Sequence, residues 1–207
     1  MLNFVIDEKL KEVLKDISTS YNIDYNELHS KYIKKRVPKT ITNTTSKPIG
    51  INDKEVVIFT DGSCINNGKV NSIGGIGVYF GEGDPRNLSQ SLPKPTNQKA
   101  ELCAILMAIK LANSRKIKIF TDSLYSINCV TKWIRNWKRN GWKNKKGEPV
   151  VNKDIIADID TLSKNKIIRY VHMNSHKREP INKKSQEWNC WHGNDMADKL
   201  ARKGCYQ

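Results

Sequence analysis

The sequence predicts an α/β fold in which helices flank a five-stranded mixed sheet. Two observations lead to this prediction. Three apolar segments follow one another through short, glycine-containing connections, which is typical of an antiparallel meander. Two further apolar segments each come after a helical pattern, and a strand reached through a helical crossover runs parallel to its neighbour. The 207 residues suffice for one such domain with a small appendage.

The antiparallel strands are expected within residues 56–63, 73–83 and 87–93. The first, VVIFTDGS, is a short apolar run that ends in turn-forming residues, and glycines close the second. Tight connections leave no room for a crossover, so these strands should be antiparallel neighbours.

Helices and parallel strands fill the rest of the domain. Residues 97–113 place small and apolar side chains on one side of a helix, and residues 116–123 should form a strand parallel to the first. The remaining expected elements are helices at 124–140, 152–165 and 193–204, a basic loop at 140–149 and a fifth strand at 167–173.

Two helices are expected ahead of this domain. An apolar stripe at Leu10, Val13, Leu14 and Ile17 predicts the first, and capping-box spacing from Asp24 predicts the second. We interpret residues 1–36 as a helical hairpin of unknown role, residues 37–53 as a flexible linker and residues 54–207 as the main domain. The hairpin could bind a protein or a nucleic acid, or be only a folding appendage.

Charge indicates a polyanionic partner. The chain has 36 Lys and Arg against 21 Asp and Glu, a formal net charge of +15. No apolar run approaches the roughly 20 residues that cross a bilayer, and the first residues lack the features of a signal peptide. Its five cysteines are scattered and odd in number, as expected of reduced thiols. We therefore expect an intracellular protein without a membrane segment, and a monomer.

Two strands end in the same four residues. Ile-Phe-Thr-Asp occurs at residues 58–61 and again at 119–122. If the strands are parallel neighbours, Asp61 and Asp122 emerge side by side, and paired carboxylates are costly unless a cation lies between them. Carboxylates on a rigid sheet suit Mg²⁺ or Mn²⁺, and two such ions could cleave a phosphodiester. The alternative is that one Asp caps a turn and the other starts a helix.

Several motifs in this order resemble type 1 ribonuclease H of the cellular, eukaryotic type. They are TDGS, TNQKAEL, IFTDS, a tryptophan-rich stretch and HGNDMADKLA, and the resemblance covers essentially all of residues 54–207. It implies the ribonuclease H-like fold and an endonuclease that hydrolyses the RNA strand of RNA–DNA hybrids with two Mg²⁺ ions, leaving 3′-OH and 5′-phosphate ends. The family's metal-binding carboxylates correspond to Asp61, Glu101, Asp122 and Asp198, with Asp198 preferred to Asp195 because it directly follows Ala in the motif.

The family also uses a histidine on a loop after the last strand. The strand-to-loop pattern Val-His-Met-Asn-Ser-His points to His176, while His192 lies closer to the final helix. In most relatives that helix follows within a few residues, whereas here an insertion intervenes. We expect residues 177–192 to form an enlarged surface loop.

The resemblance also implies contacts with the hybrid. Trp133 and Trp137 would line the channel for the DNA strand, on a basic protrusion, although tryptophans at helical spacing can also be core residues. The remaining substrate contacts correspond to Cys64, Asn66, Asn67, Asn97 and Gln98 for the ribose hydroxyls and to Thr96 and Asn152 for a phosphate, with Lys94 as a weaker candidate. Asn66 and Asn67 are also ordinary turn residues.

Two other functions remain as alternatives. One is another nuclease or an integrase on the same fold, although those usually lack the TNQ motif and the tryptophan-rich protrusion. The other is a non-catalytic hybrid-binding protein, which should have lost a carboxylate, whereas all four are present.

Overall fold

The computed structural model describes residues 54–174 and 178–207. The expected hairpin at 1–36, the linker at 37–53 and His176 lie outside the described residues, so these predictions stay predictions.

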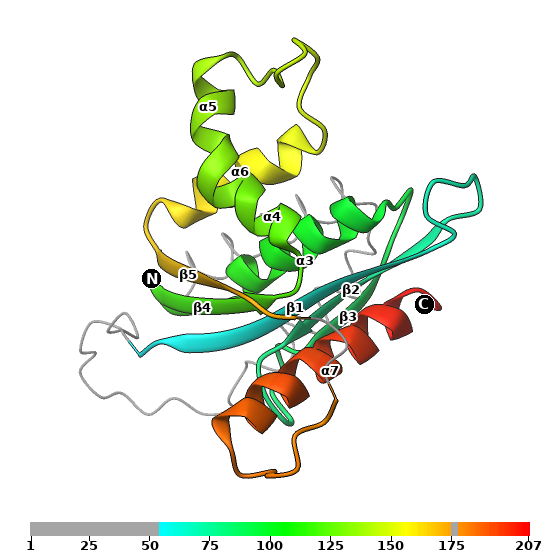
Figure 1. Cartoon of the computed structure of the whole chain (residues 1–207), viewed down its shortest axis with the longest axis vertical. Helices are drawn as coiled ribbons and strands as arrows, with labels where there is room; N and C mark the ends of the chain where they lie inside the picture. The colour runs from blue at the N-terminus through cyan, green and yellow to red at the C-terminus, as the bar shows by residue number, and fades with distance from the viewer. Residues whose placement is uncertain (1–53, 175–177) are drawn as a thin grey trace, which may run out of the picture. The chain divides into compact units, whose positions relative to one another are not determined.

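The five-stranded sheet is confirmed. Its strands are β1 (Val56–Ile65), β2 (Ile73–Tyr79), β3 (Leu88–Leu92), β4 (Lys116–Thr121) and β5 (Ile167–His172), in the order β3-β2-β1-β4-β5 (Figure 1). The first three pair antiparallel, and β4 and β5 continue the sheet in parallel.

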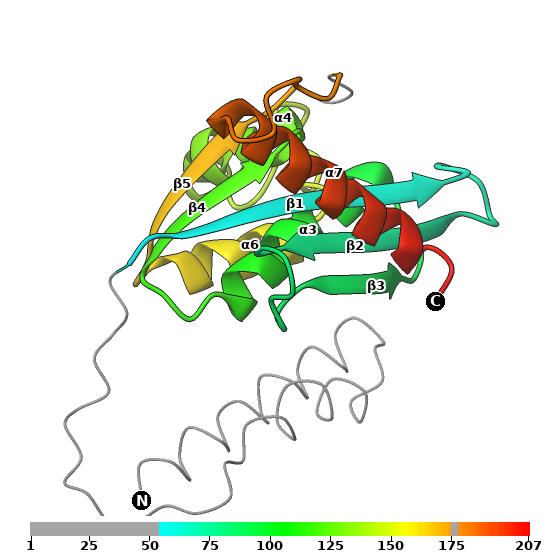
Figure 2. The same ribbon diagram turned by 90° about the horizontal axis from the view of Figure 1, so that it is seen from below.

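Helices cover both faces of the sheet (Figure 2). They are α3 (Asn97–Leu111), α4 (Leu124–Asn128), the π-helical turn η2 (Cys129–Trp133), α5 (Ile134–Arg139), α6 (Lys153–Ser163) and α7 (Gln186–Gly204). Among the described helices, only α7 covers one face, across β1, β2 and β3, while α3 packs on the opposite face with α6 beside it. No helix in the described part of the chain is long and apolar enough to cross a membrane.

The core has two parts. The larger lies on the α3 side and contains fully buried aliphatic side chains, among them Leu102, Ile105, Ile117 and Ile119. A smaller cluster under α7 joins Phe59, Tyr79 and Phe120 to Ala197, with the rings of Phe59 and Phe120 stacked 4.9 Å apart. Alternate side chains of β1 and β4 thus anchor helices on opposite faces.

The repeated Ile-Phe-Thr-Asp segments lie in register, with Ile58 opposite Ile119 and Phe59 opposite Phe120. The first strand is longer than predicted, however. β1 continues to Ile65 because β2 still pairs with it after β4 has ended at Thr121. Asp61 therefore lies inside a strand, at the point where β1 loses its parallel neighbour.

Two expected helices differ from the prediction. The single helix expected at 124–140 is interrupted by the π-helical turn η2, a feature often found near functional sites. The final helix begins at Gln186, not at residue 193, so the expected enlarged loop at 177–192 is wrong in its second part. The Ser185 hydroxyl caps the helix by accepting from the Trp188 N–H at 3.0 Å, and Trp188 stacks on His192 one turn later.

Candidate active site

Three carboxylates from separate elements converge at the edge where β4 ends. Asp61 comes from β1, Glu101 from the first turns of α3 and Asp122 from the residue after β4. Each offers an oxygen within 4.8 Å of the others. The prediction that Asp61 and Asp122 emerge together is confirmed, and Glu101 reaches the same place.

Close packing of α3 on β1 brings Glu101 to this cluster. A Cβ atom at Gly62 would lie 2.3 Å from the backbone nitrogen of Glu101, which is shorter than any real contact. Only glycine at position 62 therefore allows the helix to approach this closely. Glu101 is buried, and its Oε2 has no hydrogen-bond partner among the described residues.

The electrostatics of the cluster disfavour its charged state. Burial, followed by the charges of Asp122 and Asp198, raises the pKa of Asp61 from 3.8 to about 7. Burial and the charges of Asp61 and Asp122 raise the pKa of Glu101 well above its usual range. The Gly62 N–H donates to the Glu101 carboxylate and offsets this only in part.

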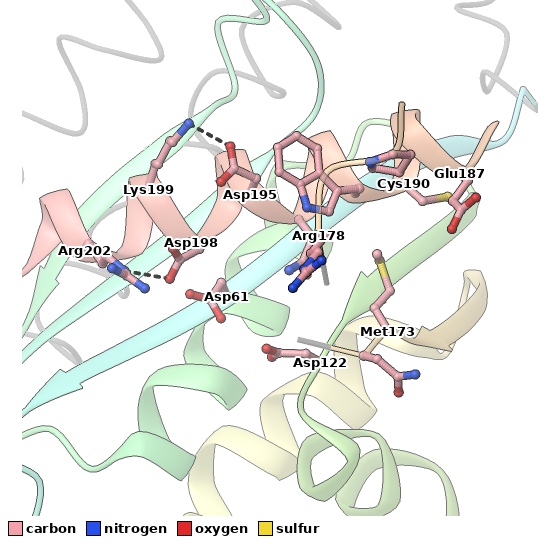
Figure 3. Close-up of a pocket in the computed structure, with 14 residues that line it drawn as sticks. Asp61, Asp122, Met173, Arg178, Glu187, Cys190, Asp195, Asp198, Lys199 and Arg202 are labelled. Carbon is pink, nitrogen blue, oxygen red and sulfur yellow. Dashed lines mark hydrogen bonds and ion pairs between the residues drawn. The ribbon is translucent and has the colours of Figure 1, made fainter. Parts of the chain in front are cut away.

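The fourth predicted acid, Asp198, approaches from α7. Figure 3 shows Asp61 lying between Asp198 and Asp122, all three lining one pocket. Helix α7 comes this close because β2 carries glycine beneath it, since a Cβ atom at Gly77 would lie 2.0 Å from the carbonyl oxygen of Ala197. Asp198 is not part of the tight group of three, and its Oδ1 accepts from Arg202 Nε at 2.9 Å.

Asp195 lies one turn earlier on the same helix. Lys199 forms an ion pair with it at 2.7 Å. Both aspartates line the pocket, but only Asp198 contributes to the raised pKa of Asp61.

The donor set fits a divalent cation. Oxygen ligands from three rigid elements suit hard cations, and a cation would relieve both the mutual repulsion and the unpartnered Glu101 oxygen. The cluster is therefore suited to hold a divalent metal ion.

Of the two candidate histidines, only His192 lies in the described part of the chain. His176 lies outside the described residues. His192 packs between Trp188, at a ring distance of 4.6 Å, and Tyr79, at 6.1 Å. The ring of His172 contacts the site instead, with Nε2 3.1 Å from the carbonyl oxygen of Asp122.

Three predicted ribose contacts lie together at the start of α3. The Asn67 side-chain oxygen accepts from the Asn97 N–H at 3.2 Å and lies 3.6 Å from the Cys64 sulfur. Asn66 has a φ of 55°, as turn chemistry requires. Gln98 is exposed one residue farther along α3. The roles of these residues remain predictions.

The two residues expected to bind a phosphate both precede helices. The Thr96 hydroxyl caps α3 by accepting from the Lys99 N–H at 3.1 Å, and Lys94 has a φ of 46° two residues before it. Asn152 precedes α6 with a φ of 59°, and its side-chain nitrogen is buried. No hydrogen bond joins Thr96 to Asn152 in the described structure.

The predicted tryptophans meet on the helical segment after β4. The Trp133 and Trp137 rings lie 5.7 Å apart, and Trp133 is 38% exposed, so it is not a core residue. Both line a hollow of about 430 Å³ together with the basic loop residues Lys143, Lys145 and Lys146.

Most of the pocket wall beside the acids was not predicted from the sequence. The pocket has a volume of about 470 Å³, and its wall includes Arg178, Pro180, Glu187, Cys190, Trp191 and Asn194. A signal was available in the sequence. Glu187, Trp191, Asp195, Asp198 and Arg202 recur at spacings of three and four, which is one face of a helix that starts before residue 193.

Comparisons with known proteins indicate the family of this chain. A sequence profile of the RNase H family matches residues 53–206. Mouse Ribonuclease H1 is 37% identical over 158 residues, which cover 74% of this chain and 51% of the mouse protein, and a Clostridium botulinum Ribonuclease H is 33% identical over 132 residues, covering 62% and 89%. The chain spans about half the length of the mouse, rat and human relatives it matches.

Solved structures show the same fold. The solution structure of the PFV RNase H domain is 28% identical, with a TM-score of 0.58 over 74% of this chain and 96% of that one. A foamy viral protease–reverse transcriptase in complex with an RNA/DNA hybrid is 29% identical, with a TM-score of 0.57 over 83% of this chain and 22% of that one. The sequence match and the shared fold together place this chain in the ribonuclease H family.

Proposed function

We propose that this protein is an endonuclease that hydrolyses the RNA strand of RNA–DNA hybrids and leaves 3′-OH and 5′-phosphate ends. The observation that carries the proposal is the group of Asp61, Glu101 and Asp122, whose oxygens lie within 4.8 Å of one another in a ribonuclease H domain. Relatives named Ribonuclease H1 and a related enzyme bound to an RNA/DNA hybrid support the substrate class.

The four acids would bind metal from different elements of the fold. Asp61, Glu101 and Asp122 would hold two Mg²⁺ ions, for which Mn²⁺ can substitute, with Asp198 completing the site from α7. Bound metal would supply an activated water and stabilise the departing oxygen of the phosphodiester. The rigid sheet and α3 fix the carboxylates before substrate arrives, so little reorganisation is needed during the reaction.

The rest of the surface would hold the hybrid. The net charge of +15 favours binding to the phosphates of both strands. The exposed ring of Trp133 and its neighbour Trp137, next to lysines of the basic loop, would contact the DNA strand. Cys64, Asn66, Asn67, Asn97 and Gln98 would sense the ribose hydroxyls, while Thr96 and Asn152 would bind a phosphate. His176 would assist proton transfer or product release.

One cleavage experiment tests the proposal. A labelled RNA strand is offered to the full chain as a hybrid, as duplex RNA and alone, with Mg²⁺ or with EDTA. Cleavage of the hybrid only, and only with Mg²⁺, is expected. Cleavage of duplex RNA or DNA would favour another nuclease of this fold, and binding without cleavage would favour a non-catalytic hybrid-binding protein.

A further inference from the structure

The pocket at the carboxylates is lined on another side by residues other than the four acids. The segment between β5 and the middle of α7 contributes Arg178, Pro180, Glu187, Cys190 and Trp191 to it. These residues belong to the insertion recognised in the sequence. The insertion therefore faces the space in which the reaction would take place.

Three cationic side chains line this pocket, and two of them are already neutralised. Lys199 pairs with Asp195 at 2.7 Å and Arg202 with Asp198 at 2.9 Å, each within one turn of α7. Among the described residues, Arg178 has no ion pair and no hydrogen bond from its guanidinium group.

The position of Arg178 makes this unpaired state informative. Figure 3 shows its guanidinium group between the Asp61–Asp122 pair and the N-terminal part of α7. Glu187 lines the same pocket and does not pair with it among the described contacts. A cation that faces a reaction pocket without a protein partner is available to an anionic ligand.

We propose that Arg178 binds a phosphate of the RNA strand next to the bond that is cleaved. A guanidinium group presents two parallel N–H donors that match phosphate oxygens. The contact is therefore directional as well as electrostatic. The phosphate belongs to the cleaved strand because Arg178 shares a cavity of about 470 Å³ with Asp61 and Asp122. This inference rests on the proposed function and assigns the insertion a part in holding substrate.

The test compares the full-length protein with Arg178→Ala, Arg178→Lys and a control, Lys184→Ala. Lys184 is exposed in the same segment and does not line the pocket. Lys184→Ala therefore removes one positive charge, as Arg178→Ala does, but no side chain from the pocket. Steady-state cleavage of the hybrid should show KM raised about tenfold in Arg178→Ala with little change in kcat, because a charge-assisted hydrogen bond to substrate is lost. Arg178→Lys should restore only part of the loss, since an ammonium group cannot bind in the two-pronged way.

Binding gives a second readout that does not need cleavage. Hybrid affinity is measured against salt concentration in an Asp61→Asn background, with and without Arg178→Ala. The slope of log K against log salt should fall by about 0.9 when one phosphate contact is lost. Thermal midpoints should be unchanged, because Arg178 is exposed and has no partner within the described structure.

Two outcomes would overturn the inference. One is an Arg178→Ala variant whose KM and salt slope match those of Lys184→Ala. The other is a lowered thermal midpoint without a change in KM, which would mean a structural role. Failure of the wild-type protein to cleave the hybrid would instead refute the proposed function, and the binding experiment would still decide on Arg178.

Discussion

The carboxylate cluster and the helical segment after β4 offer opposite environments to a nucleic acid. At the cluster, oxygens of Asp61, Glu101 and Asp122 lie within 4.8 Å of one another, and burial raises the pKa values of Asp61 and Glu101. At the segment, the Trp133 and Trp137 rings lie beside lysines of the basic loop. The first region repels phosphate unless metal is bound, whereas the second attracts it. The rate of cleavage and the affinity for the hybrid should therefore respond to different substitutions.

The largest expected effect comes from Asp61→Asn. The substitution preserves shape but removes a metal ligand, so kcat for the hybrid should fall by at least about 10³-fold. Hybrid binding should stay the same or tighten, because a negative charge facing phosphate is lost. Cleavage assays and equilibrium binding measure the two effects separately.

Asp195→Asn is the matched control for that substitution. Asp195 lines the same pocket, but it is not one of the four acids assigned to the metal and does not contribute to the raised pKa of Asp61, so its loss should leave most activity intact. Equal losses of activity in Asp61→Asn and Asp195→Asn would contradict the assignment of Asp61, and not Asp195, to the metal site.

The double substitution Trp133→Ala and Trp137→Ala tests the other region. Loss of both aromatic surfaces should weaken hybrid binding by about 2 to 4 kcal/mol. The salt dependence should change little, because stacking and not counterion release is lost. A binding titration at several salt concentrations checks both expectations, and unchanged affinity would mean that the rings only pack on each other.

A smaller effect concerns stability of the metal-free protein. The pKa of the Asp61 carboxyl is raised from 3.8 to about 7 in the folded protein, so its protonated form favours folding. This stabilisation is complete below pH 3.8, the pKa of the unfolded chain, and is lost as pH rises through about 7. In EDTA, Asp61→Asn should therefore gain stability over wild type between these values, reaching on the order of 2 kcal/mol above pH 7. Thermal melts across pH measure the difference.

Mg²⁺ provides the control for that measurement. At pH 8 it should raise the thermal midpoint of the wild-type protein, since binding to the folded state stabilises it. The rise should be smaller in Asp61→Asn, and an equal rise would place the bound metal elsewhere.

The smallest expected effect comes from one lysine of the basic loop. Lys146→Ala should lower the salt slope of hybrid binding by about 0.9, with kcat unchanged. Lys164→Ala removes the same charge at the end of α6, away from the hollow beside the tryptophans. A similar slope change in both variants would show that net charge, not position, controls affinity.

Local patterns were sufficient for much of the fold. Apolar runs, turn residues and the helical patterns between them predicted all five strands in order, and the repeated Ile-Phe-Thr-Asp predicted that Asp61 and Asp122 would meet. The π-helical turn η2 was not visible in the same way, because it differs from an α-helix in the spacing of its backbone hydrogen bonds and not in a residue pattern. The start of α7 was missed because polar residues hid the helical period that follows the Ser185 cap.

By itself, the sequence determined the order of the elements, the family and the candidate acids, because each depends on residue types at short spacings along the chain. Only the tertiary structure decided what those acids experience. Gly62 lets Glu101 approach Asp61, and Gly77 lets α7 bring Asp198 to the same pocket. The resulting repulsion, and the place of Arg178 in the same pocket, depend on the proximity of residues far apart in sequence, which no local pattern encodes.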